Sequence, residues 1–239
     1  MKGSDFKYRT LEAEVMDDFY LEGDELRSIL NDIDKVNSWL GGNKITLEGI
    51  KKILHRHTDH IFRIMDVGCG NGNMLREVAD FGRNHNYKFN LTGIDANEHA
   101  IKIAQELSVD YPEISYLPLN IFSEAFKDVK TDIILCTLTL HHFKEEEIDQ
   151  LMKLFIRNAS LGVVINDLER SPVAYHLFRL FCAAFIDNEI ARKDGLISIR
   201  RGFRRKDLER LGRKLPVVQE INWKWAFRYQ WILYNKRKS

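Results

Sequence analysis

From residue 61 onward, short continuous apolar runs alternate with longer stretches that carry an apolar residue at every third or fourth position. Such a pattern predicts buried β-strands that alternate with amphipathic helices. The expected strands are Phe62–Val67, Phe89–Ile94, Ile114–Leu119, Asp132–Thr137 and Gly162–Ile165. The expected helices between them are Asn71–Phe81, Asn97–Val109 and Lys144–Asn158. Because the strands are apolar on both sides, we expect a parallel sheet that is covered by helices on both faces.

The pattern differs on either side of this region. The spacing before residue 61 predicts helices over Leu11–Tyr20, Asp24–Trp39 and Thr46–His57. They either cover the mouth of a site or form a packing layer on the sheet, and the pattern does not distinguish these two arrangements. After the fifth strand we expect one aromatic-rich helix or a helix pair over Ser171–Ile190, followed by a helix over Arg205–Leu211.

Two β-like runs end the chain, Val217–Trp225 and Phe227–Tyr234. They lie too close together for a crossover, so they must form an antiparallel pair at a sheet edge. The full pattern predicts a single α/β domain over residues 1–239, with a Rossmann-like, doubly wound, seven-stranded sheet whose last strand is antiparallel. Residues 1–60 form its helical cap, residues 61–239 its core, and residues 168–200 a helical insertion.

Charge and composition narrow the function only slightly. The formal net charge of +1 gives no global field toward nucleic acid, which makes nucleic acid an unlikely partner. No apolar run approaches the roughly 20 residues that span a bilayer. Cys69, Cys136 and Cys182 stand singly in apolar stretches, and the N-terminus lacks the form of a signal peptide. These features favour a reduced, cytoplasmic protein.

The first strand ends in a glycine-rich turn that suggests a cofactor site. Asp66 is followed by Gly68, Gly70 and Gly72, whereas a dinucleotide-binding turn has the spacing G-x-G-x-x-G. An acid at the strand end would repel a diphosphate, but it suits a cationic or amine-bearing ligand. Asp95 ends the second strand, where a carboxylate can accept both hydroxyls of a ribose.

The third strand is followed by Leu119-Asn120-Ile121, where a side-chain amide and an apolar neighbour could hold an adenine. Asp66–Gly72, Asp95-Ala96 and Asp132–Leu135 resemble the class I methyltransferases that use S-adenosylmethionine, a family that often has Asp at the position of Asn120. The resemblance covers residues 60 to 166. It implies that Gly68 and Gly70 flank the methionine part of the cofactor and that Asp66 interacts with its amino group through water or backbone. It also implies that Asp95 binds the ribose and that Asn120 and Ile121 lie at the adenine. Ala96, directly after Asp95, and Thr137, at the end of the fourth strand, complete the expected cofactor contacts.

Candidate catalytic residues follow the fourth and fifth strands. His141 and His142 lie beyond the fourth strand, and Asn166 and Asp167 end the fifth, so all four should face the ligand crevice. One of the two histidines could deprotonate an acceptor hydroxyl, or the pair could simply open the next helix. Asp167 could orient a substrate hydroxyl, pair with Arg170 or cap a helix. Adjacent histidines without a placed carboxylate are poor evidence of a metal site, so we expect none.

The acceptor is less well defined. The aromatic stretch from Tyr175 to Ile186 suggests a pocket for a flat or greasy molecule, or a helix that faces the core. Asn166–Tyr175, Arg200–Phe203 and Glu14–Asp18 are similar to small-molecule methyltransferases of aromatic polyketide or quinol biosynthesis. This resemblance implies O-methylation of a phenolic or quinol acceptor, with Tyr175 and Arg200 as candidate substrate contacts. Two alternatives stay open: an RNA or protein methyltransferase that uses the basic residues 200–214, and a non-catalytic member of the fold.

Overall fold

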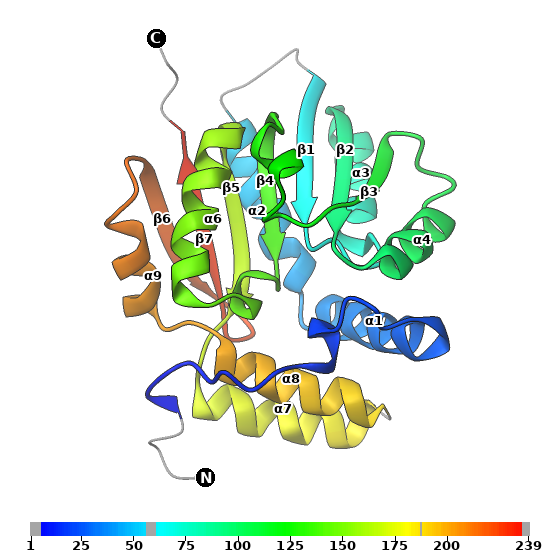
Figure 1. The fold of residues 1–239 in the computed structure, drawn as a ribbon, viewed down its shortest axis with the longest axis vertical. Helices are drawn as coiled ribbons and strands as arrows, with labels where there is room; N and C mark the ends of the chain where they lie inside the picture. Colours follow the sequence, from blue (N-terminus) through cyan, green and yellow to red (C-terminus); the bar gives the residue numbers. More distant parts are fainter. Residues whose placement is uncertain (1–5, 56–60, 187, 236–239) are drawn as a thin grey trace.

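The computed structural model describes residues 6–55, 61–186 and 188–235, and its centre is a seven-stranded sheet (Figure 1). The strands follow the order β3-β2-β1-β4-β5-β7-β6. Their bounds are Ile61–Val67 (β1), Lys88–Asp95 (β2), Ile114–Pro118 (β3), Thr131–Thr137 (β4), Ala159–Leu168 (β5), Val218–Lys224 (β6) and Arg228–Tyr234 (β7). The predicted doubly wound sheet is confirmed.

The strand directions also agree with the prediction. β1 pairs in parallel with β2 and β4, and β4 pairs in parallel with β5. β7 lies antiparallel between β5 and β6. The chain therefore reverses its direction of winding between β1 and β4, and ligands bind at such a point, beyond the carboxyl ends of the strands.

Helices cover both faces of the sheet and also its carboxyl edge (Figure 1). The apolar sides of α2 (Gly42–Leu54), α3 (Asn73–His85) and α4 (Glu98–Leu107) join one core cluster with β1, β2 and β4. The second face carries the short α5 (Glu124–Lys127), α6 (Glu145–Asn158) and α9 (Arg205–Gly212). α1 (Gly23–Trp39), α7 (Pro172–Phe185) and α8 (Glu189–Arg201) lie beyond the strand ends, so that the crevice is covered.

The N-terminal helices were expected either to cover the mouth of a site or to pack on the sheet, and each arrangement is found for one helix. The α1 side chains Ile29, Ile33 and Asn37 line the crevice, so α1 covers its mouth. α2 instead buries Ile50 and Ile53 in the core beside the sheet. It begins at Gly42 rather than Thr46, because Gly41 adopts a left-handed φ of 70° and lets the chain start a new helix directly after α1. The predicted end of this helix, His57, lies outside the described residues.

The predicted helix over Leu11–Tyr20 is wrong. Only Val15–Asp17 form a short 3₁₀ turn, η2. The backbone N–H groups of Val15 and Met16 donate to the carboxylate of Asp194 on α8, at 3.0 and 3.1 Å. Contacts with α8 thus replace the helical hydrogen bonds that the local pattern favours. The Ser171–Ile190 segment holds one helix, α7, and only the first two residues of α8, which continues to Arg201, so the predicted range misses most of the second helix. Among the described residues, no helix has both the length and the apolar character that are needed to cross a bilayer.

Candidate active site

A cavity of about 1540 Å³ lies beyond the carboxyl ends of β1, β2, β4 and β5. α1, η2, α7 and α8 supply its other walls. Binding sites for a single small molecule usually have a volume of roughly 300–1,000 Å³. The cavity therefore has room for two ligands side by side.

The glycine turn after β1 forms one wall of this cavity. Gly68 and Gly72 have φ values of 71° and 77°, a region that is costly for any residue with a Cβ. A Cβ at Gly68 would lie 2.4 Å from the side chain of Thr139, and one at Gly72 would lie 2.1 Å from Tyr116 Oη. The turn therefore brings bare backbone to the ligand space and packs against the loop that follows β4.

Asp66 lies at the base of the turn with its side chain fully buried. Burial raises the pKa of its carboxyl to about 8, and the neighbouring charge of Asp95 adds to this effect. Oδ1 of Asp66 has no hydrogen-bond partner among the described residues. A buried acceptor without a partner is costly, so this atom fits a ligand that brings an N–H group or a positive charge.

Asp95 joins the glycine turn to the second β-α unit. Its Oδ2 accepts from the backbone N–H of Gly70 at 3.0 Å, and its Oδ1 accepts from that of Asn97 at 2.9 Å. Burial raises the pKa of this carboxyl, although both N–H groups oppose the shift. Each carboxylate oxygen can accept more than one hydrogen bond, so Asp95 can hold the turn and still accept from ribose hydroxyls.

The expected adenine end lies after β3. Asn120, Ile121, Phe122 and Ala96 all line the cavity. Oδ1 of Asn120 already accepts from the backbone N–H of Phe122 at 2.9 Å, which shapes the turn and leaves one lone pair for a base. Phe122 packs edge-on against Phe143, with ring centroids 5.5 Å apart. An aromatic wall therefore lies beside the position that we assigned to an adenine.

His141 and Asp167 form a buried pair where β4 and β5 end. Asp167 Oδ1 lies 2.7 Å from His141 Nδ1, and Oδ2 accepts from the His141 backbone N–H at 3.1 Å. Burial of Asp167 disfavours its charge, but His141, the backbone N–H of Leu168 and His142 together outweigh this effect and lower the carboxyl pKa. A carboxylate only accepts, so the ring proton lies on Nδ1, and Nε2 of the neutral ring carries a lone pair.

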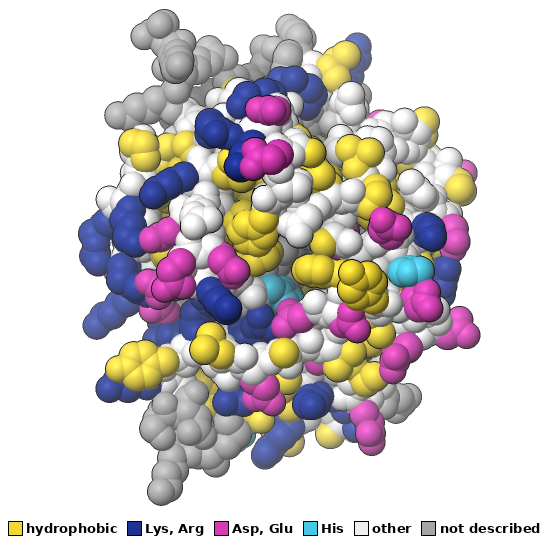
Figure 2. All heavy atoms as spheres, in the orientation of Figure 1, with side chains coloured by type: hydrophobic (Ala, Val, Ile, Leu, Met, Phe, Trp, Pro, Cys, Tyr) yellow, Lys and Arg dark blue, Asp and Glu magenta, His cyan; other side chains and the backbone are white. Residues whose placement is uncertain are grey.

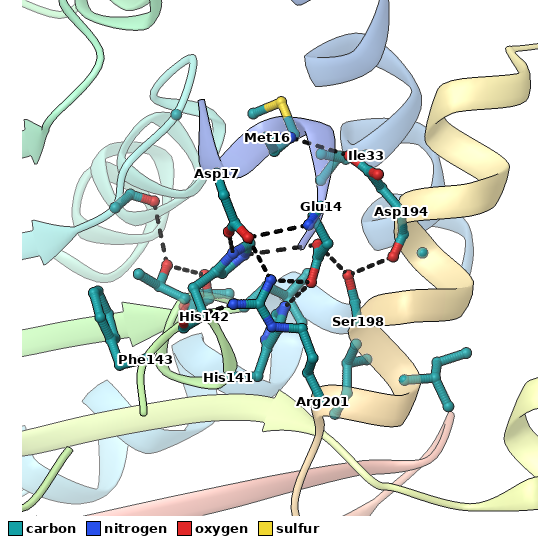
Figure 3. A pocket seen from close by; sticks show the side chains of 18 of the residues that line it. Glu14, Met16, Asp17, Ile33, His141, His142, Phe143, Asp194, Ser198 and Arg201 are labelled. Atoms are coloured by element: carbon teal, nitrogen blue, oxygen red, sulfur yellow. Dashed lines mark hydrogen bonds and ion pairs between the residues drawn. The ribbon is translucent and has the colours of Figure 1, made fainter. Parts of the chain in front are cut away.

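Three residues that lie in the segments similar to small-molecule methyltransferases, but that were not predicted as site residues, surround the histidines (Figure 3). Glu14 and Asp17 come from the η2 segment, and Arg201 from the end of α8. Arg201 Nη1 lies 2.7 Å from Asp17 Oδ2 and 3.2 Å from Glu14 Oε1. Asp17 Oδ1 lies 2.6 Å from His142 Nδ1. The expectation that the histidines lack a placed carboxylate is therefore wrong, because the N-terminal segment supplies two.

Other candidates lie elsewhere than expected. Tyr175 does not line the cavity; it packs against Phe6, with ring centroids 5.6 Å apart. Arg200 also lies outside the cavity, where it forms an ion pair with Glu12 at 2.7 Å. Neither side chain lines the cavity, so the structure does not support these two predicted substrate contacts. Phe178 and Phe181 line the cavity instead.

The remaining strand-end residues connect α2 to the sheet. Thr137 lines the cavity and shares a 3.0 Å hydrogen bond with Thr46. Asn166 donates to the carbonyl of Gly42 at 2.9 Å and to the hydroxyl of Thr46 at 3.1 Å. The side-chain amide nitrogen of Asn166 thus links the end of β5 to α2.

Comparison with known proteins finds similarity to methyltransferases. A family model described as a methyltransferase domain matches residues 64–160. Ubiquinone biosynthesis O-methyltransferase of Rickettsia typhi is 26% identical over 152 residues, which are 60% of this chain. The match covers 56% of that relative, so the chain spans about half the length of the curated protein it matches.

Solved structures with the same fold extend over nearly the whole chain. The plantazolicin methyltransferase BpumL in complex with SAH has a TM-score of 0.66 at 17% identity, covering 88% of this chain and 90% of that one. Magnesium protoporphyrin IX methyltransferase (ChlM) of Synechocystis PCC 6803 with bound SAM has a TM-score of 0.58 at 12% identity. That match covers 89% of this chain and 90% of the other.

Proposed function

We propose that this chain, a class I methyltransferase whose cofactor is S-adenosylmethionine, methylates a hydroxyl group of a small aromatic acceptor. The observation that carries the proposal is the His141–Asp167 pair at the strand-end floor of the cavity. His141 lines the cavity, and Asp167 fixes a ring proton on its Nδ1, so Nε2 is the nitrogen that can accept a proton from an acceptor. A base in this position suits a weakly acidic hydroxyl such as a phenol or a quinol.

The cofactor half of the site fits the residues present. S-adenosylmethionine, when bound, supplies an activated methyl group on a sulfonium. Asp66 offers its unpartnered Oδ1 to the amino group, and Asp95 offers its free lone pairs to the ribose. The bare backbone at Gly68 and Gly70 allows close approach.

The acceptor half adjoins this site. Thr139 packs directly on Gly68, so the loop that carries His141 and His142 touches the wall of the cofactor site. An acceptor at His141 therefore lies next to the reacting end of the cofactor, and positioning of this kind supplies much of the catalysis of methyl transfer.

Aromatic side chains from α7 line the acceptor side. Phe178 and Phe181 stack with centroids 6.3 Å apart, and Phe181 meets Trp39 of α1 at 6.1 Å. Flat, apolar molecules are the ligands that such walls bind best. The relatives act on acceptors of varied size, so we infer the aromatic class of acceptor from these walls and not from the neighbours.

The alternative, an RNA or protein acceptor bound by residues 200–214, is less favoured. Figure 2 shows Lys and Arg gathered over α9 at the left edge, with acidic side chains among them. Arg210 pairs with Glu145, Lys214 with Asp149, and Arg205 with Glu209 at 2.9 Å. Paired basic side chains have less charge available for phosphates.

A transfer assay with radiolabelled S-adenosylmethionine tests the proposal. The panel contains monophenols, quinols, an N-terminal amine peptide and total RNA. We expect label on phenols or quinols, in an ether bond that is stable to mild base. Label on RNA or peptide only, or label on none of the panel despite cofactor binding, would contradict the proposal.

A further inference from the structure

The two histidines of the active site hold their rings in the same way. His141 Nδ1 lies 2.7 Å from Asp167 Oδ1, and His142 Nδ1 lies 2.6 Å from Asp17 Oδ1. Because each carboxylate only accepts, each Nδ1 carries the ring proton, and each neutral ring keeps its lone pair on Nε2. Histidines that bind metal ions are almost always oriented by this kind of hydrogen bond from the other ring nitrogen.

Both lone pairs are directed at one carboxylate (Figure 3). His141 Nε2 lies 3.7 Å from Glu14 Oε1, and His142 Nε2 lies 3.9 Å from Glu14 Oε2. These distances are too long for hydrogen bonds. A divalent ion about 2.1 Å from each ligand atom would space neighbouring ligands roughly 3.0–3.4 Å apart, so small side-chain movements would bring all three into contact with one ion. One ligand atom from each residue already lies within 4.8 Å of the others.

His141 Nε2 provides an independent observation. Only 2% of the His141 side chain is exposed, and Nε2 has no hydrogen-bond partner among the described residues. Leaving a buried acceptor unsatisfied costs about 1–3 kcal/mol, so the geometry calls for a ligand at this atom. The residue lines the cavity, which gives such a ligand a route of entry.

The local charge also favours a cation. Three carboxylates contact the histidine pair or face it: Glu14, Asp17 and Asp167. Only Arg201 forms ion pairs with them, through Glu14 and Asp17, among the residues that the structure describes. Arg9 and Asp194 lie in the next layer and oppose each other in charge. The three carboxylates therefore outnumber the one cation paired with them, an imbalance that a divalent ion would offset.

We propose that His141, His142 and Glu14 bind a divalent transition-metal ion at the acceptor end of the cavity. Two imidazoles and one carboxylate suit Zn²⁺, Mn²⁺ or Co²⁺ better than Mg²⁺, which prefers oxygen ligands. Three protein ligands leave coordination positions open toward the cavity, where an acceptor hydroxyl oxygen completes the set.

The inference rests on the proposed function for its chemical role and refines it. With the ion bound, His141 Nε2 is a metal ligand and no longer the base, and the ion instead lowers the pKa of the hydroxyl. The O–H bond breaks and its proton passes to cavity water. The oxygen then forms its bond to carbon as the bond between carbon and the cofactor sulfur breaks.

The test measures metal binding directly. Untagged full-length protein is stripped with a chelator, dialysed against Zn²⁺, Mn²⁺, Co²⁺ or Mg²⁺, and its metal content is measured. We expect one Zn²⁺ per chain, a visible absorption band on Co²⁺ loading, and no retained Mg²⁺. Glu14→Gln and His142→Gln should lose binding, and Asp17→Asn, which removes the hydrogen bond that orients His142, should weaken it about 10–100-fold.

His99→Gln is the matched control, because His99 lies on α4 and pairs with the exposed Glu22 at 3.2 Å. This variant should bind Zn²⁺ as the wild type does. Absence of Zn²⁺, Mn²⁺ and Co²⁺ binding, or binding that Glu14→Gln and His142→Gln leave unchanged, would overturn the metal site.

Methyl transfer measured on the same samples separates the two proposals. Transfer by metal-free protein that binds no ion refutes only the metal site. A bound ion with no transfer to any hydroxyl refutes only the proposed function.

Discussion

Replacing Asp167 by Asn tests how the active site uses His141. The carboxylate accepts from three donors: His141 Nδ1 at 2.7 Å, the His141 backbone N–H at 3.1 Å and the Leu168 backbone N–H at 2.7 Å. An amide has only one oxygen. Whichever way the Asn side chain lies, its NH₂ group faces one backbone donor, and the imidazole loses its negative partner.

The magnitude follows from these contacts. One buried N–H without an acceptor should lower the free energy of unfolding by about 1–3 kcal/mol. A midpoint decrease of roughly 2–4 °C per kcal/mol is expected for a chain of this size. Loss of the charge that supports His141 should decrease kcat by about 10²–10³-fold, within the range attributed to a positioned base. This corresponds to about 2.7–4 kcal/mol in the activation barrier.

Asp132→Asn is the matched control. Asp132 is also a buried aspartate; it accepts from the Arg63 backbone N–H at 2.9 Å and from Ser160 Oγ at 2.8 Å, but at the start of β4, away from the cavity. We expect a comparable loss of stability with kcat unchanged. Steady-state kinetics, cofactor calorimetry and urea unfolding of both variants provide the comparison. If Asp167→Asn retained kcat within about threefold of the wild type, our assignment of the pair would be refuted.

Three further predictions follow from other parts of the site. Gly72→Ala should lower the free energy of unfolding by about 2 kcal/mol or more, because its Cβ would lie 2.1 Å from Tyr116 Oη. Gly41 is also left-handed but lies in open space, so Gly41→Ala should lower the free energy of unfolding by only about 1 kcal/mol. Equal losses for the two variants in urea unfolding would contradict this prediction. Asp66 has its folded-state pKa raised to about 8 from 3.8, so the folded state binds the extra proton, and stability relative to Asp66→Asn should fall as pH rises from about 4 to 8. The slope should approach about 1.4 kcal/mol per pH unit, and parallel stability curves for the two proteins would argue against a buried, protonated Asp66. Phe181→Ala should raise the KM of an aromatic acceptor roughly tenfold without changing cofactor affinity. A change in cofactor affinity alone would show that Phe181 contacts the cofactor and not the acceptor.

Most of the fold could be predicted from the sequence because its signals are local. Apolar runs and helical spacing identify each strand and its covering helix, and parallel strands place their carboxyl ends together. β4 and β5 pair with Thr137 opposite Asn166, so the loops that carry His141 and Asp167 must meet. The glycine turn could be predicted in the same way, because Asp66 and the alternating glycines that indicate it are neighbours in the sequence.

The features of the site that could not be predicted depend on contacts between segments that are distant in the sequence. Glu14 and Asp17 are three residues apart, a spacing that also suits a helix. They are held instead by Arg201 and His142, which lie 125 to 187 residues away in the chain. The direction of a side chain on α7 or α8 also depends on how that pair packs, which explains why the sequence could not show that Tyr175 and Arg200 lie outside the cavity.

Calorimetric titration of the purified chain with S-adenosylhomocysteine, and in parallel with NADH, tests the central claim most directly. Our account predicts one S-adenosylhomocysteine bound per chain, weakened at least tenfold by Asp95→Asn, and no measurable heat with NADH. Binding of NADH in competition with S-adenosylhomocysteine, or no binding of either molecule, would contradict it.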